Sequence, residues 1–245
     1  TGKGIGPTYT DKISRNGLRV GDILDNFEAK YKAHKERHLQ MLASLNYTDF
    51  DITEVEKTWM EGVEYMKQFR IVDSEHEINN LLRSDKSILC EGAQGTMLDV
   101  DFGSYPFVTS SNTICAGACT GLGIGPNRIG NVYGIMKAYC TRVGAGPFPT
   151  ELFDETGKLI RDLGHEYGAV TGRERRCGWI ALVQLRYSVM VNGVTELIMM
   201  KSDVLDGFET IKACVAYRLP DGSETTELPY EIDNVEPIYK EMKGW

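Results

Sequence analysis

The sequence predicts an α/β protein with a mainly parallel sheet flanked by helices, a small helical layer in the first third and a hairpin near the C-terminus. Apolar residues recur at helical spacing through the first third, and short apolar runs alternate with helical segments after it. The 245 residues, 42% of them hydrophobic, suffice for one large domain or two small ones. We therefore expect a glycine-rich loop plus helical subdomain over residues 1–85 and a central α/β sheet region over residues 86–245.

The first third is expected to hold helices at residues 22–45, 51–70 and 74–82, after an irregular, glycine-rich opening. Thr53 and Glu56 have the spacing of a capping box, in which each side chain binds the other residue's backbone N–H. These helices predict a small layer of their own.

The pattern changes after residue 86. We expect short strands at residues 87–90 and 196–200, a longer strand at 131–143, and a helix at 180–191 that ends at Asn192-Gly193. The strand at 196–200 is apolar after Glu196, which predicts that it is buried.

A hairpin is expected closer to the C-terminus. Residues 211–219 and 224–228 read as strands, and Pro220-Asp221-Gly222 between them is a strong turn sequence.

Composition excludes several classes of function. The net charge of -8 opposes non-specific binding of nucleic acid, and no apolar run approaches the roughly 20 residues that span a bilayer. The six cysteines form no Cys-x-x-Cys pair, so we expect reduced thiols of a cytoplasmic protein and no cysteine metal site. The chain begins Thr1-Gly2-Lys3 without Met or an apolar leader, and we expect a fragment.

Two glycine-rich segments are candidates for binding phosphate or a base. Alternating glycines in residues 1–7 let backbone amides approach an anion, although a plain flexible loop explains them as well. Residues 91–96 follow the first expected strand and present Gln94, whose amide suits the edge of a purine; a tight turn with a solvated Gln is the alternative. The hydroxyl cluster at residues 109–113 either caps a helix or holds a phosphate.

Residues 168–176 combine glycines with three arginines, at positions 173, 175 and 176. Guanidinium groups pair with phosphate or carboxylate through two parallel hydrogen bonds. Although an arginine run is usually a solvated face, this one lies between glycines, and the chemistry favours an anion-binding loop.

Lys201-Ser202-Asp203 follows the expected strand at 196–200. A carboxylate there can accept hydrogen bonds from both N1–H and the exocyclic amine of guanine, a donor pair that adenine lacks. An ordinary turn at the end of a strand is an equally good explanation of these residues alone.

Taken in order, these segments resemble one family from end to end, the adenylosuccinate synthetases. The matching stretches are residues 1–7, 11–22, 91–101, 105–117, 168–179 and 201–207. The resemblance implies a GTP-dependent ligase of AMP biosynthesis that joins IMP to L-aspartate, yields GDP and phosphate, and uses Mg²⁺. In the implied reaction, O6 of IMP attacks the γ-phosphate of GTP, and the amine of aspartate then displaces phosphate from C6.

The resemblance also implies roles for residues at matching positions. The implied IMP contacts are Thr1, Arg15, Gln94, Thr109 and Arg173. Arg15 is similar to an arginine that reaches the IMP phosphate of a partner subunit, which implies a homodimer.

The resemblance implies an aspartate-binding loop that closes over its substrate, and a guanine site. The loop residues are Ala169, Val170, Thr171, Gly172, Arg173, Glu174 and Arg175. The implied GTP contacts are Arg175, Lys201, Ser202 and Asp203. Val170 stands where a threonine is common, and Lys3 where an arginine is frequent.

The family's phosphate loop, Gly-Asp-Glu-Gly-Lys-Gly-Lys, does not occur in these 245 residues, nor does a histidine in the matching catalytic context. The base and the metal ligands of the family lie there, so we expect no catalytic residue and no metal ligand in this chain and no turnover by it alone. A nucleotide-binding module without chemistry and a structural dimerisation segment remain as alternatives.

Overall fold

The structure is a computed structural model that describes residues 4–168 and 172–245. The chain divides into two compact units, Thr1–Ile88 and Leu89–Trp245.

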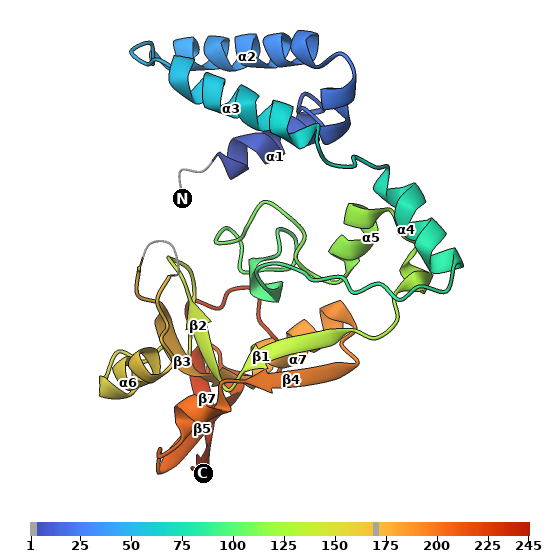
Figure 1. Cartoon of the computed structure of the whole chain (residues 1–245). Helices are drawn as coiled ribbons and strands as arrows, with labels where there is room; N and C mark the ends of the chain where they lie inside the picture. Colours follow the sequence, from blue (N-terminus) through green and yellow to red (C-terminus); the bar gives the residue numbers. More distant parts are fainter. Residues whose placement is uncertain (1–3, 169–171) are drawn as a thin grey trace. The chain divides into compact units, whose positions relative to one another are not determined.

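The first unit is helical (Figure 1). Its elements are α1 (Ile5–Ser14), η1 (Val20–Leu24), α2 (Phe27–Ser44), α3 (Thr53–Met66) and α4 (Ser74–Arg83). The three predicted helices are confirmed, but the prediction of an irregular opening was wrong, because α1 begins at Ile5. Gly4 takes the left-handed conformation just before α1, and Pro7 lies in the first turn, where its missing N–H costs no helical hydrogen bond.

The predicted capping box of α3 was also wrong. The hydroxyl and backbone N–H of Thr53 donate instead to Asp51 Oδ1, at 2.6 and 2.9 Å. Glu56 accepts from the hydroxyl of Tyr31 at 2.6 Å and from Lys35 Nζ at 2.6 Å. The carboxylate that was expected to cap α3 therefore ties α3 to α2.

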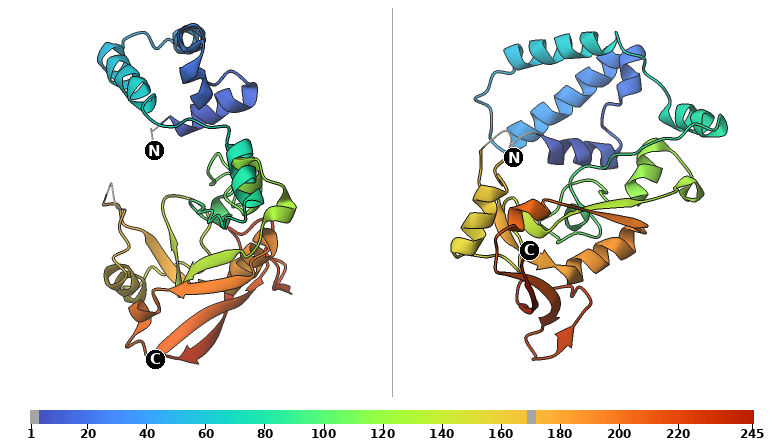
Figure 2. Two further views of the ribbon diagram at one scale, coloured as in Figure 1. Left: turned by 45° about the vertical axis from the view of Figure 1, so that its right-hand side comes forward. Right: turned by 60° about the horizontal axis from the view of Figure 1, so that its bottom comes forward.

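The second unit carries two sheets. Its strands are β1 (Tyr133–Lys137), β2 (Tyr139–Arg142), β3 (Arg176–Ala181), β4 (Glu196–Met200), β5 (Thr210–Arg218), β6 (Glu224–Thr225) and β7 (Glu236–Lys243). β1 and β4 form a two-stranded sheet, and the other five strands form a sheet in the order β2-β3-β5-β6, with β7 on the other side of β5. Figure 2 shows both sheets from two further directions.

The expectation of a mainly parallel sheet was wrong. The pairs β1–β4 and β3–β5 are parallel, whereas β2–β3, β5–β6 and β5–β7 are antiparallel. The fold is α/β with mixed sheets. The short turn after β5 forces β6 to pair with it in the antiparallel direction. The predicted arginine loop extends to residue 176, where β3 begins.

Three strand predictions need correction. Residues 87–90 form no strand, and Leu89 is exposed. The segment 131–143 is two strands rather than one, because the chain leaves the first sheet at Ala138 and enters the second. β4 is exposed along its whole length, since a sheet of only two strands cannot cover its apolar side chains.

The helices of the second unit are α5 (Ala116–Leu122), α6 (Glu155–Leu163) and α7 (Leu182–Asn192). The predicted end of α7 is confirmed, with Gly193 left-handed at φ 62°. The hairpin of β5 and β6 is confirmed as well, closed by Leu219 N–H donating to Ser223 at 2.8 Å. Three short 3-10 segments, η2 (Thr96–Leu98), η3 (Pro126–Arg128) and η4 (Ser202–Leu205), complete the unit.

The main core of the second unit lies where α6 and η4 pack on the larger sheet. Its buried side chains are Ala138, Tyr139, Ile160, Cys177, Trp179, Val204, Leu205 and Ile211. This core fixes the ends of β1, β3 and β4, from which the candidate site is built. In the part of the chain that the structure describes, no helix has the length and apolar character to cross a bilayer.

Candidate anion-binding site

Glu166 is the centre of the candidate site. Its side chain is 1% exposed, and it receives Lys137 Nζ at 2.6 Å and the hydroxyl of Tyr139 at 2.6 Å on one oxygen. Arg175 donates to the other oxygen at 2.8 Å, and Lys201 Nζ lies 3.8 Å from the first. A buried carboxylate thus gathers three cations.

Strand register brings these side chains together. β1 and β4 are parallel, and Lys137 pairs with Met200, so Lys137 and Lys201 lie at the same carboxyl edge of this sheet. Ligand sites of α/β proteins typically form where parallel strands end. Glu166 follows α6, and its backbone C=O accepts from Arg175 N–H at 2.9 Å.

The charges in this cluster do not cancel. Three cations meet one carboxylate, which leaves two positive charges, and the side chains of Lys137, Arg175 and Lys201 are 27–37% exposed. Burial alone would raise the pKa of Glu166, but hydrogen bonds from Lys137 and Tyr139 and the nearby cations hold that pKa below its usual value. Burial, followed by the contact with Glu166, raises the pKa of Tyr139, so its hydroxyl stays a donor. The result is a rigid, solvent-accessible patch of positive charge that suits an anion.

The predicted aspartate loop is closed at its base by backbone contacts. Gly168 N–H donates to the backbone C=O of Arg173 at 2.8 Å, and Gly172 N–H donates to the backbone C=O of Gly168 at 2.7 Å. Tyr167 and Glu174 form an isolated antiparallel bridge. Gly172 is left-handed at φ 63°, a conformation that favours glycine. Residues 169–171, and with them the predicted contacts Ala169, Val170 and Thr171, lie outside the described residues.

The three arginines of this segment differ in their surroundings. Arg175 joins Glu166 in the cluster, while Arg173 and Glu174 are exposed. Arg176 binds both carboxylate oxygens of Glu151 and the carbonyls of Gly144 and Gly146, which is a structural role.

Gln94 and Thr109 lie on one compact loop region that Asp99 organises. Asp99 is fully buried, and its carboxylate accepts four backbone N–H groups at 2.6–3.1 Å, from Asp101, Phe102, Thr113 and Ile114. Burial would raise the pKa of Asp99, but these donors hold it below its usual value.

Within this loop region, Thr109 N–H donates to Leu98 at 2.8 Å. Gln94 is exposed in the left-handed region at φ 65°, and Thr109 is half-buried. Asn192 at the end of α7 supports the loop, donating to Thr96 Oγ1 at 2.9 Å and accepting from Cys115 N–H at 2.8 Å.

The predicted guanine contacts follow β4. Lys201 is left-handed at φ 58° and donates to Gly164 C=O, and Ser202 and Asp203 open η4 with Asp203 exposed. The Lys201 side chain is therefore held toward Glu166, beside Arg175, and the exposed Asp203 carboxylate is two residues away in the chain.

The remaining predicted IMP contacts lie in the first unit. Arg15 is exposed and left-handed at the end of α1, at φ 66°. Thr1 lies outside the described residues. The structure thus brings Arg175 and Lys201 together at Glu166. It places Gln94 and Thr109 on the same loop region, in which Thr113 Oγ1 donates to Gly95 C=O.

Sequence reasoning missed Glu166, Lys137, Tyr139 and Asp99. Asp99 lies within a segment that was matched to the family, yet nothing local distinguishes its carboxylate from the exposed one of Asp101. Glu166 directly precedes the arginine loop, and an acidic residue beside several cations is the signal that was available.

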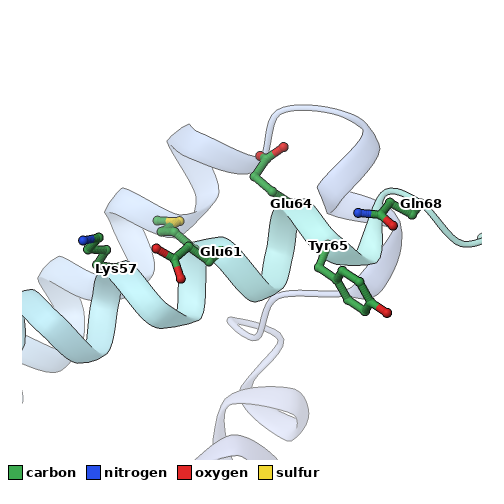
Figure 3. A pocket seen from close by; sticks show the side chains of 6 residues that line it. Lys57, Glu61, Glu64, Tyr65 and Gln68 are labelled. Carbon is green, nitrogen blue, oxygen red and sulfur yellow. The ribbon is translucent and has the colours of Figure 1, made fainter.

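A hollow of about 510 Å³ lies elsewhere, along α3 (Figure 3). Its lining residues, among them Lys57, Glu61 and Tyr65, come from α3 and from Gln68 just beyond its end. Side chains from one helix and its last turn do not converge on a ligand, so this hollow is the open surface of a helix.

Comparison with known proteins shows which family the sequence and the fold of this chain match. The sequence model described as "Adenylosuccinate synthetase" matches residues 1–245. Adenylosuccinate synthetases of Phocaeicola vulgatus and Bacteroides thetaiotaomicron are 79% and 74% identical over 246 residues, covering 100% of this chain and 58% of each relative. The structure of a fully ligated adenylosuccinate synthetase from Plasmodium falciparum matches with a TM-score of 0.91 and 38% identity, covering 99% of this chain and 58% of that one.

The fold and the charged cluster define a mixed α/β protein with a positively charged edge that suits an anion. The chain belongs to the adenylosuccinate synthetase family. It spans 58% of the length of the relatives named above.

Proposed function

We propose that this chain is the substrate-recognition part of a GTP-dependent ligase that joins IMP to L-aspartate and forms adenylosuccinate in AMP biosynthesis. The observation that carries the proposal is the family match over all 245 residues. The charge excess around Glu166 supports it, because the substrates are polyanions or dianions and need fixed cations.

The proposed roles follow from side-chain chemistry. Arg175 lies on a patch that binds a phosphate or carboxylate, and Arg173 and Gly172 belong to the loop that takes aspartate. Asp203 accepts from N1–H and the exocyclic amine of guanine, while the Lys201 stem lies along the base. Gln94 and Thr109 take the base and phosphate of IMP, as does Thr1 on the phosphate side.

Mg²⁺ is the cofactor implied by the family, but the residues around this cluster do not fit it. Mg²⁺ requires oxygen ligands with free lone pairs. The Glu166 carboxylate is taken by cations and a hydroxyl, and that of Asp99 by four backbone N–H groups. We assign no magnesium ligand to these residues, and the 245 residues expressed alone are expected to lack turnover.

The proposed protein is a cytoplasmic homodimer in which Arg15 serves the IMP site of the partner subunit. The proposed subdomains remain residues 1–85 and 86–245, close to the two compact units. Support for the role of Arg15 comes from its exposure at the end of α1.

The activity is tested in a polypeptide of the relatives' full length that contains these residues. Hydrolysis of GTP should require both IMP and aspartate, and adenylosuccinate should form in equal amount. GTP hydrolysis that is independent of aspartate would favour a nucleotide-binding protein with another reaction and would overturn the proposal.

The role of Arg15 has its own test in the same polypeptide. Arg15→Leu should raise the KM for IMP at least about tenfold, since a charge-assisted phosphate contact is worth roughly 1.5–3 kcal/mol. Arg37→Leu, which changes another exposed arginine of the first unit, should leave the KM unchanged. Equal KM values for the two variants would exclude the proposed contact.

A further inference from the structure

The first unit contains a cluster of possible metal ligands that the proposed function does not use. Asp11 on α1 faces His34 and His38 on α2, and one ligand atom from each lies within 4.8 Å of the others. Within residues 4–168 and 172–245, this is the one such group of three or more His, Cys, Asp or Glu side chains.

The secondary structure dictates this arrangement. His34 and His38 are four residues apart on α2, so their side chains project from the same face. Asp11 is 7% exposed, and its backbone C=O accepts from Asn16 and Gly17 N–H at 2.9 and 3.1 Å, which fixes the end of α1. Two rigid helices thus hold the three ligands.

The hydrogen-bond partner of His34 indicates which of its ring nitrogens carries the proton. His34 Nδ1 lies 3.1 Å from the carbonyl oxygen of Asn16, which can only accept, so the proton is on Nδ1. In the neutral imidazole, Nε2 then carries a lone pair, and this atom lies 3.6 Å from Asp11 Oδ2. Two acceptors face each other, an arrangement that a cation between them stabilises.

We propose that Asp11, His34 and His38 bind a divalent transition-metal ion, Zn²⁺ being the best match. Two imidazoles and a carboxylate with a water molecule make a common four-coordinate zinc set, whereas Mg²⁺ and Ca²⁺ prefer oxygen ligands. Ligand atoms around tetrahedral zinc are about 3.3 Å apart. The 3.6 Å separation of His34 and Asp11 already suits this geometry.

His38 needs a small adjustment. Its Nε2 lies 2.7 Å from Asp11 Oδ2, a hydrogen bond in which Nε2 is the donor. On metal binding, the imidazole proton moves to Nδ1 and the two atoms separate slightly. The site is open to solvent, because the imidazoles are 22% and 31% exposed and border a hollow of about 320 Å³.

A metal ion here would link α1 to α2. Its ligand on α1, Asp11, lies four residues before Arg15 in the sequence. This inference does not depend on the proposed ligase activity, and its test does not measure that activity.

The test is titration of the 245-residue chain with Co²⁺ and Zn²⁺, followed by visible absorption and calorimetry, in a Cys90→Ser background that removes the exposed thiol. We expect binding of one ion per chain without a thiolate-to-cobalt absorption band. His34→Gln and His38→Gln should each weaken binding at least about tenfold. His76→Gln is the matched control on α4 and should stay within about twofold.

Several results would overturn the site. These are absence of stoichiometric binding, unchanged affinity in His34→Gln, or equal weakening in His76→Gln. Circular dichroism of each variant tests for retained helices. Should His38→Gln lose the helices, His34→Gln alone decides, because the polar contacts given for the His34 ring are one backbone carbonyl and the Asp11 carboxylate, beside its tilted contact with the His38 ring.

Discussion

At the scale of single residues, two buried carboxylates organise the second unit in opposite ways. Glu166 collects side-chain cations, and Asp99 collects backbone N–H groups. Each is stable as an anion only because its partners are fixed in place. Removing the charge should therefore cost far more than at an exposed acidic residue.

Glu166→Gln should lower the free energy of unfolding by about 3 kcal/mol, since it leaves the half-buried Lys137 and Arg175 without the countercharge of the buried Glu166. Urea denaturation followed by fluorescence measures this. Glu174→Gln, in which an exposed glutamate loses its 3.2 Å pair with Arg161, should cost less than about 1 kcal/mol. Equal losses in the two variants would show that Glu166 does not organise the cluster.

Asp99→Asn should cost about 2 kcal/mol at neutral pH, because the amide cannot accept all four N–H groups and turns its own donors toward some of them. The folded pKa of Asp99 is lowered, so its contribution is complete above the unfolded pKa of about 4 and disappears as the pH falls through the folded value. The variant should lose part of the acid dependence of the urea midpoint, whereas Asp101→Asn should keep it. If the urea midpoint of Asp99→Asn depends on pH as steeply as that of the parent, this account of Asp99 is contradicted.

At the scale of elements, β3 connects the site to the core, and its packing is tight. A Cβ on Gly178 would collide with the backbone carbonyl of Thr150, on a segment that also bridges to β3 at Glu151. By contrast, a Cβ on Gly121 in α5 meets nothing within 4 Å.

Gly178→Ala should therefore destabilise the second unit by about 1–3 kcal/mol through overpacking. Gly121→Ala should be neutral or stabilise it by up to about 1 kcal/mol, because alanine favours a helix. Thermal unfolding of both variants measures the difference. A Gly178→Ala protein as stable as the parent would mean that β3 and the Thr150 segment are not packed as described.

At the scale of the whole molecule, local patterns predicted much of the fold but not its pairing. The helical periodicity of residues 27–44 and the left-handed Gly193 are local features and were read correctly. β3 was not predicted, because Cys177 and Gly178 directly follow an arginine run. The direction in which two strands pair was not predicted either, because it depends on residues that are far apart in the sequence. The same contrast holds for the candidate site. The sequence predicted Arg175 and Lys201 as binding residues, but not the buried Glu166 between them, whose contacts join residues that are far apart in the sequence.

The most direct test of the central claim, that this chain recognises the substrates of the ligase, compares GTP with ITP, which lacks the exocyclic amine. In a polypeptide of the relatives' full length, we predict a KM for ITP about 10- to 100-fold above that for GTP, from one lost charge-assisted hydrogen bond. Asp203→Asn should raise the KM for GTP and shrink this preference severalfold, while the exposed neighbour variant Asp206→Asn should preserve it. An undiminished preference for GTP in Asp203→Asn would contradict the account.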